Sequence, residues 1–244
     1  NVILFEILMD RKPFDDVRVR KALDMAIDKE GIVKYVTRGG EIPAATLVPP
    51  GMPNYRSPEG LPFNPEEAQR LLAEAGYPGG HGFPKTEYLF NTSEANKDIA
   101  EVIQQMWKKY LGIDVTLVNQ EWKVFLSTVK NLDYQIARGN WIGDYVDPNT
   151  FIDMFVTGGG NNRTGWSNRR YDQLIEAAAE EKDEDKRMEI FREAENILVA
   201  DDLPILPVYY HVSLDMYRPH VKGVSPNLLN IHPWKYIRTD KETP

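Results

Sequence analysis

The sequence contains no cysteine, and histidine is rare among its 244 residues. The absence of thiols excludes cysteine catalysis, disulfide bonds and cysteine-ligated metals. The four histidines are far apart and show no paired ligand spacing, so we predict no metal site and no other cofactor. They are His81, His211, His220 and His232.

Long apolar runs and an excess of basic residues are also lacking. No stretch of about 18 consecutive apolar residues occurs, so no membrane-spanning segment is expected. The net charge of -8 argues against a general nucleic-acid binder, which needs a basic face to displace counterions. With 42% hydrophobic and 27% charged residues, the composition is ordinary for a folded, water-soluble protein of one large or two small domains.

The first residues, NVILFEILMDRKPF, lie within an apolar run that has neither a charged leader nor a small-residue cleavage site. This pattern is not that of a signal peptide. It is typical of a β-strand entered partway, and we therefore expect the chain to be a fragment of a longer protein.

Helix signals alternate with strand signals along the chain. Asp15 and Asp16 offer an N-cap to the first helix, and the Asn64–Pro65 pair has the cap-then-proline order of another. Helices are predicted over residues 17–27, 29–38, 65–75, 94–111, 122–130, 169–182 and 185–200, with a short one after Pro148. Strands are predicted at the N-terminus and over 86–92, 113–121, 134–141 and 204–217. The alternation favours an α/β or α+β domain with a mixed sheet.

Two carboxylates stand in the segment GNWIGDYVDPNTF, residues 139–151, between a predicted strand and a predicted helix. They could bind a cation, take part in acid–base chemistry or cap the helix. Asp147 directly precedes Pro148, so the N-cap role is the better interpretation for it. The simplest interpretation of Asp144 is an aspartate within a turn, whose carboxylate accepts hydrogen bonds from backbone N–H groups.

An ordered series of segments covering nearly the whole chain resembles the oligopeptide/dipeptide-binding family (family 5) of the extracellular solute-binding proteins of ABC importers. The segments are PFDDVRVRKALDMAIDKEGIV, PAATLVPPGM, FNPEEAQRLLAEAGYP, LFNTSEANKDIAEVIQQMWKKYLGIDVTLVNQEWKVF, NWIGDYVDPNTF, GWSNRRYDQLI and LPILPVYYHV. Any one of them is weak support, whereas the complete order is strong support.

The resemblance implies the second lobe of a two-lobed fold like the type II periplasmic binding proteins. Residues 1–212 would be the C-terminal lobe, and residues 213–244 a tail returning towards an N-terminal lobe that this chain lacks. The implied function is capture of oligopeptides and their delivery to the permease subunits of an ABC transporter. The resemblance also implies a monomeric, non-enzymatic, extracytoplasmic protein, with any lipid anchor in the missing N-terminus.

By the family pattern, Asp144 pairs with the α-amino group of a bound peptide. Trp141 and Tyr145 would form aromatic walls beside it, lowering the local dielectric. A carboxylate in such surroundings holds an ammonium group strongly because little water competes. The nearest cations, Arg138 and Lys130, would neutralise the carboxylate terminus of the peptide.

Trp122 and Asn91 match family positions at the cleft, and His211 lies where the lobe would connect back towards its partner, in a place that also suits hinge packing. Structural alternatives remain for several candidates: core packing for Trp122 and His211, an Asx turn for Asn91, an ion pair for Arg138. Strand alternation predicts that Arg138 and Trp141 face opposite sides of the sheet.

Two other functions remain as alternatives. A hydrolase could use Asp144 and Asp147 as acid and base, although no Ser-His-Asp or metal constellation supports an enzyme. Oligosaccharides or other small solutes could replace peptides as the ligand. Because half of the cleft is missing, we expect this chain alone to bind peptides weakly or not at all.

Overall fold

A computed structural model describes residues 1–240, so the last four residues of the expected 213–244 tail lie outside it. Its main feature is a six-stranded sheet in the order β2-β6-β1-β5-β3-β4. The strands are β1 (Val2–Ile7), β2 (Ile42–Pro43), β3 (Thr86–Asn91), β4 (Val115–Gln120), β5 (Ile136–Trp141) and β6 (Ile205–Tyr210).

The sheet is mixed, as predicted. Strands β3, β4 and β5 run parallel, whereas β1 is antiparallel to both of its neighbours, β5 and β6. Every residue of β1 is buried, which fits a strand between two others and covered on both faces. In the register, Val2 pairs with Trp141 and with Tyr210, so β1 starts at the edge of the sheet where β5 and β6 end.

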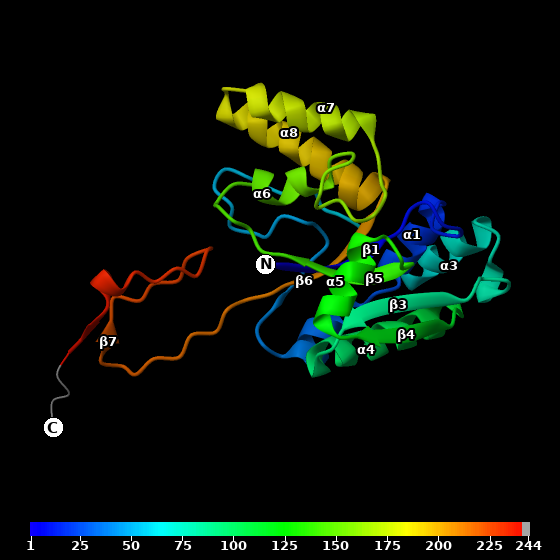
Figure 1. The fold of residues 1–244 in the computed structure, drawn as a ribbon, viewed down its shortest axis with the longest axis horizontal. Coiled ribbons are helices and arrows are strands. Elements are labelled where there is room, and N and C mark those ends of the chain that lie inside the picture. Colours follow the sequence, from blue (N-terminus) through cyan, green and yellow to red (C-terminus); the bar gives the residue numbers. More distant parts are fainter. Residues whose placement is uncertain (241–244) are drawn as a thin grey trace.

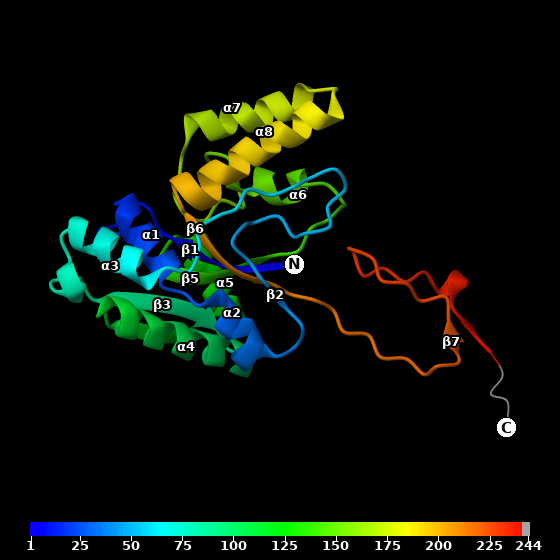
Figure 2. The same cartoon turned by 180° about the vertical axis from the view of Figure 1, so that it is seen from behind.

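Helices cover both faces of the sheet, giving an α/β/α arrangement (Figures 1 and 2). They are α1 (Val17–Met25), α2 (Lys29–Gly31), α3 (Pro65–Glu74), α4 (Glu94–Leu111), α5 (Trp122–Lys130), α6 (Asn149–Ile152), α7 (Arg169–Glu180) and α8 (Glu184–Asn196). A π-helical turn (Ile32–Thr37) follows α2, and a second one (Ile197–Asp201) follows α8.

Local capping explains where several helices begin. Asp16 accepts a hydrogen bond from Arg18 N, and Asn64 accepts one from Glu67 N, so both predicted caps are confirmed. Ser93 stands at the N-cap position of α4, but its side chain makes no capping bond. The length of α4 and its apolar stripe stabilise this helix through packing instead.

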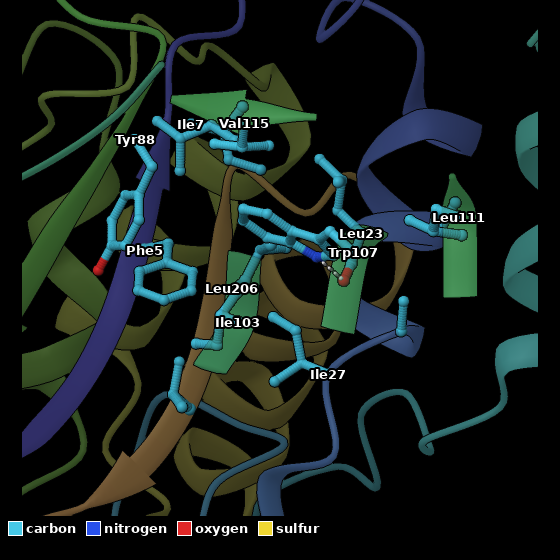
Figure 3. Packing of buried hydrophobic residues seen from close by; sticks show 14 of the residues in the cluster. Phe5, Ile7, Leu23, Ile27, Tyr88, Ile103, Trp107, Leu111, Val115 and Leu206 are labelled. Carbon is cyan, nitrogen blue, oxygen red and sulfur yellow. Dashed lines mark hydrogen bonds between the residues drawn. The ribbon is translucent and has the colours of Figure 1, made fainter. Parts of the chain in front are cut away.

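The largest core cluster lies between α1, α3, α4 and one face of the sheet (Figure 3). Trp107 of α4 is its largest fully buried side chain, and its indole N–H donates to Leu23 O at 3.0 Å. Phe5 of β1 packs against the rings of Trp107 and Tyr88, with centroid separations of 6.2 and 4.8 Å. Each such ring contributes about 2–3 kcal/mol by leaving water.

Two clusters cover the opposite face. Val2 and Leu4 of β1 pack with residues of α6, α7 and α8. Helix α5 packs through Phe125 and Val129 against Leu89 of β3 and the neighbouring Ala137 of β5. Alternate residues of the central strands therefore point to opposite faces of the sheet, as strand geometry requires.

One predicted strand is too long. The pattern in residues 204–217 predicts one continuous strand, but β6 ends at Tyr210 and residues 211–217 have no regular structure. Tyr210 pairs with Val2 of β1 and with Ile42 of β2, and one further backbone hydrogen bond joins His211 N–H to Asn1 O at 2.9 Å. Within the described residues, strand pairing of β6 ends there.

The tail extends away from the sheet in both views (Figures 1 and 2). It contains a two-stranded ribbon of β7 (Val221–Lys222) and β8 (Arg238–Thr239). Large apolar side chains are open to solvent along it, including Met216 at 99% and Trp234 at 86% exposure. Leu228 approaches the body near Gly51, where the two segments border a cavity.

Candidate functional site

Most of the predicted site residues lie at one edge of the sheet. Asn91 ends β3, Trp141 ends β5, and His211 follows the end of β6. Because β3, β5 and β6 point the same way, their carboxyl ends meet at the edge where β1 starts. Trp122 lies there as well, since it begins α5 just after the end of β4. In open α/β sheets, ligands bind outside the carboxyl ends of the strands.

Asp144 lies in the loop between β5 and α6, and its side chain is exposed. Its backbone N–H donates to Thr150 Oγ1 at 3.0 Å. Within residues 1–240 its carboxylate accepts no hydrogen bond, so the turn-acid interpretation, in which backbone N–H groups satisfy this side chain, is wrong. The carboxylate is available to an external cation.

The two aromatic neighbours of Asp144 differ in their surroundings. Trp141 is half-buried against the cluster of α6–α8, and its indole N–H donates to Thr150 O at 2.6 Å. Tyr145 is 45% exposed, and its hydroxyl accepts a hydrogen bond from Asn149 Nδ2 at 3.0 Å. Trp141 is thus anchored, and Tyr145 presents its ring to solvent beside Asp144.

Asp147 has a structural role, as predicted. Its carboxylate accepts Asn149 N–H at 2.9 Å and one hydrogen bond from each terminal NH2 group of the Arg187 guanidinium, at 2.7 and 2.9 Å. Although partial burial acts in the opposite direction, the hydrogen bonds from Arg187 and Asn149 lower the pKa of Asp147. A paired carboxylate with a lowered pKa is a poor general acid, which weakens the hydrolase alternative.

Arg138 and Trp141 occupy opposite faces of the sheet, as strand alternation predicts. Arg138 is paired with Phe5, on the α4 face, whereas Trp141 is paired with Val2, on the α8 face. No carboxylate of residues 1–240 forms an ion pair with Arg138. The ion-pair interpretation of Arg138 is therefore wrong for the described part of the chain.

The Arg138 guanidinium instead donates to two amide oxygens, Asn140 Oδ1 at 3.1 Å and Asn91 Oδ1 at 3.5 Å. Burial lowers the pKa of Arg138, although the side chain stays protonated at neutral pH. It lines a cavity of about 360 Å³ together with Tyr209 and His211. Glu41 and Asp98 line the same cavity, so carboxylates as well as the Arg138 guanidinium border it.

Asn91, His211 and Trp122 complete this edge. The Asn91 side chain accepts from Asn96 Nδ2 at 3.1 Å, rather than closing an Asx turn. His211 Nδ1 lies 3.8 Å from Glu41 Oε1, and its ring is half exposed. Trp122 is 48% exposed and stacks on Phe125, so it is not a core residue.

Lys130 does not join the other candidates. It is the last residue of α5, which runs from the end of β4 back to the start of β5. The start of β5 lies beside the end of β1, where Leu8 N donates to Gln135 O. Lys130 is therefore at the opposite edge of the sheet, and we remove it from the candidate site.

A second cavity, of about 520 Å³, borders the Asp144 loop. Gly143 and Tyr145, the neighbours of Asp144, contribute to its wall, as do Ile142, Met52 and the tail residue Leu228. No Asp, Glu, Lys or Arg is among the described residues that line it. Its size falls in the range of ligand pockets.

Several residues contact the candidate site although no sequence pattern predicts that they would. Thr150 and Arg187 contact the loop from α6 and α8, and Asn140 accepts from Arg138. Asp153 lies near Asp144, and burial together with the Asp144 charge raises its pKa. Such roles arise from chain segments that meet only after folding.

No three His, Asp or Glu side chains of residues 1–240 are grouped as they would be around a metal ion. In the same range, every helix is too short or too polar to traverse a bilayer.

Residues 1–163 match the family described as bacterial extracellular solute-binding proteins, family 5 Middle. The chain is also 37% identical over 223 residues to the oligopeptide-binding protein OppA of Bacillus subtilis, covering 88% of this chain and 41% of that protein. The chain belongs to this family, as its sequence predicts, and its members are substrate-binding proteins rather than enzymes.

Solved structures agree. A periplasmic oligopeptide-binding protein of Borrelia burgdorferi matches with a TM-score of 0.87 and 36% identity, over 98% of this chain and 48% of that one. Haemophilus influenzae OppA, in a complex with the peptide RPPGFSPFR, matches with a TM-score of 0.85 and 30% identity, over 98% and 48%. These binding proteins have the type II periplasmic-binding fold, which confirms the predicted fold class. The chain spans less than half the length of these relatives.

Proposed function

We propose that this chain is the ligand-binding C-terminal lobe of an extracytoplasmic protein that captures oligopeptides and delivers them to an ABC-type permease. The observation that carries the proposal is the exposed Asp144 carboxylate, which has no hydrogen-bond partner within residues 1–240, at the edge of the sheet where β3, β5 and β6 end. The names of the relatives, which include oligopeptide- and dipeptide-binding proteins, support the same ligand class.

Asp144 and Arg138 supply opposite charges at one edge, which suits a peptide with a free amine and a free carboxylate. Asp144 would pair with the ammonium group beside the exposed ring of Tyr145. Arg138, held by Asn91 and Asn140, would receive a carboxylate from its cavity on the α4 face. Trp122 and His211 would contact the peptide between or beside these points.

The lobe would occupy residues 1–212, and residues 213–244 would return to the N-terminal lobe, which this chain lacks. The exposed apolar side chains of the tail, such as Met216 and Trp234, support a covering partner. Closure of the two lobes would bury the peptide by hinge motion. The whole protein would act as a monomer outside the cytoplasm. This chain alone should bind peptides weakly or not at all, and micromolar binding by it would contradict the two-lobed site.

The test replaces Asp144 by Asn in the full-length protein and measures binding of short alanine peptides by calorimetry. Loss of the buried charge pair should weaken binding by about a hundredfold. Acetylation of the peptide amine should weaken binding to the unchanged protein by the same factor as Asp144→Asn does. In the Asp144→Asn variant, acetylation should cause no further loss of affinity. Asp133→Asn, an exposed carboxylate at the opposite edge, is the matched control. Unchanged affinity of the Asp144 variant would refute the amine pairing.

A further inference from the structure

The buried side chain of Thr150 joins the loop that carries Asp144 to α6. Thr150 is 2% exposed and lies in the first turn of α6. Its hydroxyl oxygen accepts the Asp144 N–H at 3.0 Å, and its carbonyl accepts the Trp141 indole N–H at 2.6 Å. One residue thus joins the proposed amine-binding acid to one of its aromatic walls.

The backbone at Gly143 packs closely against α6. A Cβ built on Gly143 would lie 2.8 Å from the Phe151 ring and 3.1 Å from Thr150 Cγ2. These separations are shorter than ordinary carbon contacts, so only glycine permits the backbone to approach α6 this closely. The Asp144 N–H can therefore reach the Thr150 hydroxyl.

The far end of the loop has its own anchor. Asp147 is held by two hydrogen bonds from Arg187 of α8, whose guanidinium also lies 4.6 Å from the centre of the Phe191 ring. This pair holds the backbone at Asp147 but makes no contact with Asp144. Between Trp141 and Asp147, the bond to Thr150 is the hydrogen bond that holds the main chain at Asp144.

We propose that Thr150 is a positioning residue: it fixes the Asp144 carboxylate relative to Trp141, and so sets the affinity for the amino end of the ligand. The inference rests on the proposed function, since it assumes that Asp144 is the amine-binding acid. Thr150 itself acts through the backbone of Asp144 and the indole of Trp141. A change at Thr150 should therefore alter ligand affinity without removing any ligand-contacting group.

The experiment uses the full-length protein and short alanine peptides. Thr150→Val keeps the volume of the side chain but removes the acceptor, leaving the Asp144 N–H without its bond. We expect peptide affinity in calorimetry to fall about tenfold, as for loss of one part-buried hydrogen bond. Thr150→Ser retains the hydroxyl and should restore affinity to within about twofold of the original, by the same reasoning. Thr86→Val, which removes another buried hydroxyl at the start of β3, is the control and should leave affinity unchanged.

Amide exchange in the 244-residue chain gives a second readout that needs no ligand. Thr150→Val should speed exchange at the Asp144 amide and leave the Met9 amide, which donates to Thr164 O, protected. The proposal is overturned if the Val variant binds like the original protein, or if the Ser variant binds as poorly as the Val variant. If Asp144→Asn also leaves affinity unchanged, the proposed function itself fails.

Discussion

A buried carboxylate on α8 determines where the proline-rich loop of residues 41–62 lies. Glu195 is 0% exposed. Its Oε1 accepts Leu47 N–H at 2.8 Å and Val48 N–H at 2.7 Å, and its Oε2 accepts the Tyr55 hydroxyl at 2.5 Å. This loop supplies part of the wall of the cavity beside Asp144. We predict that Glu195→Ala destabilises the protein strongly.

The magnitude follows from the donors left behind. Without the carboxylate, two N–H groups and one hydroxyl are left buried without a hydrogen-bond acceptor. Each unsatisfied donor costs about 1–3 kcal/mol. Relaxation of the loop and entry of water reduce the sum, so we expect the free energy of unfolding to fall by about 4 kcal/mol. Tyr55→Phe removes one of the three bonds and should cost about 1.5 kcal/mol.

Urea unfolding of this chain, followed by circular dichroism at neutral pH, measures these changes. The matched control is Glu193→Ala on the same helix. Glu193 pairs with Arg170 at the surface, so its loss should cost less than about 0.5 kcal/mol. Tyr55→Phe should cost little once Glu195 is already alanine, because its partner is gone. A loss below about 1 kcal/mol in Glu195→Ala, or additive effects in the double variant, would refute the reasoning.

Two more predictions concern Glu6 and Gly143. Burial raises the pKa of Glu6 from 4.5 to about 7, so stability should fall by about 3 kcal/mol as pH rises from 4.5 through 7. Glu6→Gln should flatten this dependence in urea unfolding at several pH values, and an unchanged slope would disprove the assignment. Gly143→Ala should displace the Asp144 loop and weaken peptide binding by the full-length protein about tenfold in calorimetry, as for loss of the part-buried hydrogen bond between Asp144 N–H and Thr150. Gly160→Ala is the control and should not weaken binding, because a Cβ built on Gly160 meets no atom within 4 Å. Equal peptide affinity of the Gly143→Ala and Gly160→Ala variants would contradict the close packing of Gly143 as the cause.

The local structure was largely predictable from the sequence. Helix α5 covers the predicted residues, Trp122–Lys130, and the caps Asp16 and Asn64 act as expected. Opposite facing of Arg138 and Trp141 also followed from alternation along β5. These features depend on side-chain periodicity and on bonds between residues a few positions apart, so they are encoded within short segments.

Other features depended on which segments meet. The strand predicted over 204–217 stops at Tyr210, where its pairing with Val2 of β1 and with Ile42 of β2 ends. Lys130 left the site because α5 carries it back across the sheet. Arg187 reaches Asp147 from 40 residues away, and no local pattern indicates that pair. Alternation and capping need only neighbouring residues. Strand pairing and ion pairing between distant segments are set when the chain packs, and that packing also decides which charged side chains lie at the edge where β3, β5 and β6 end.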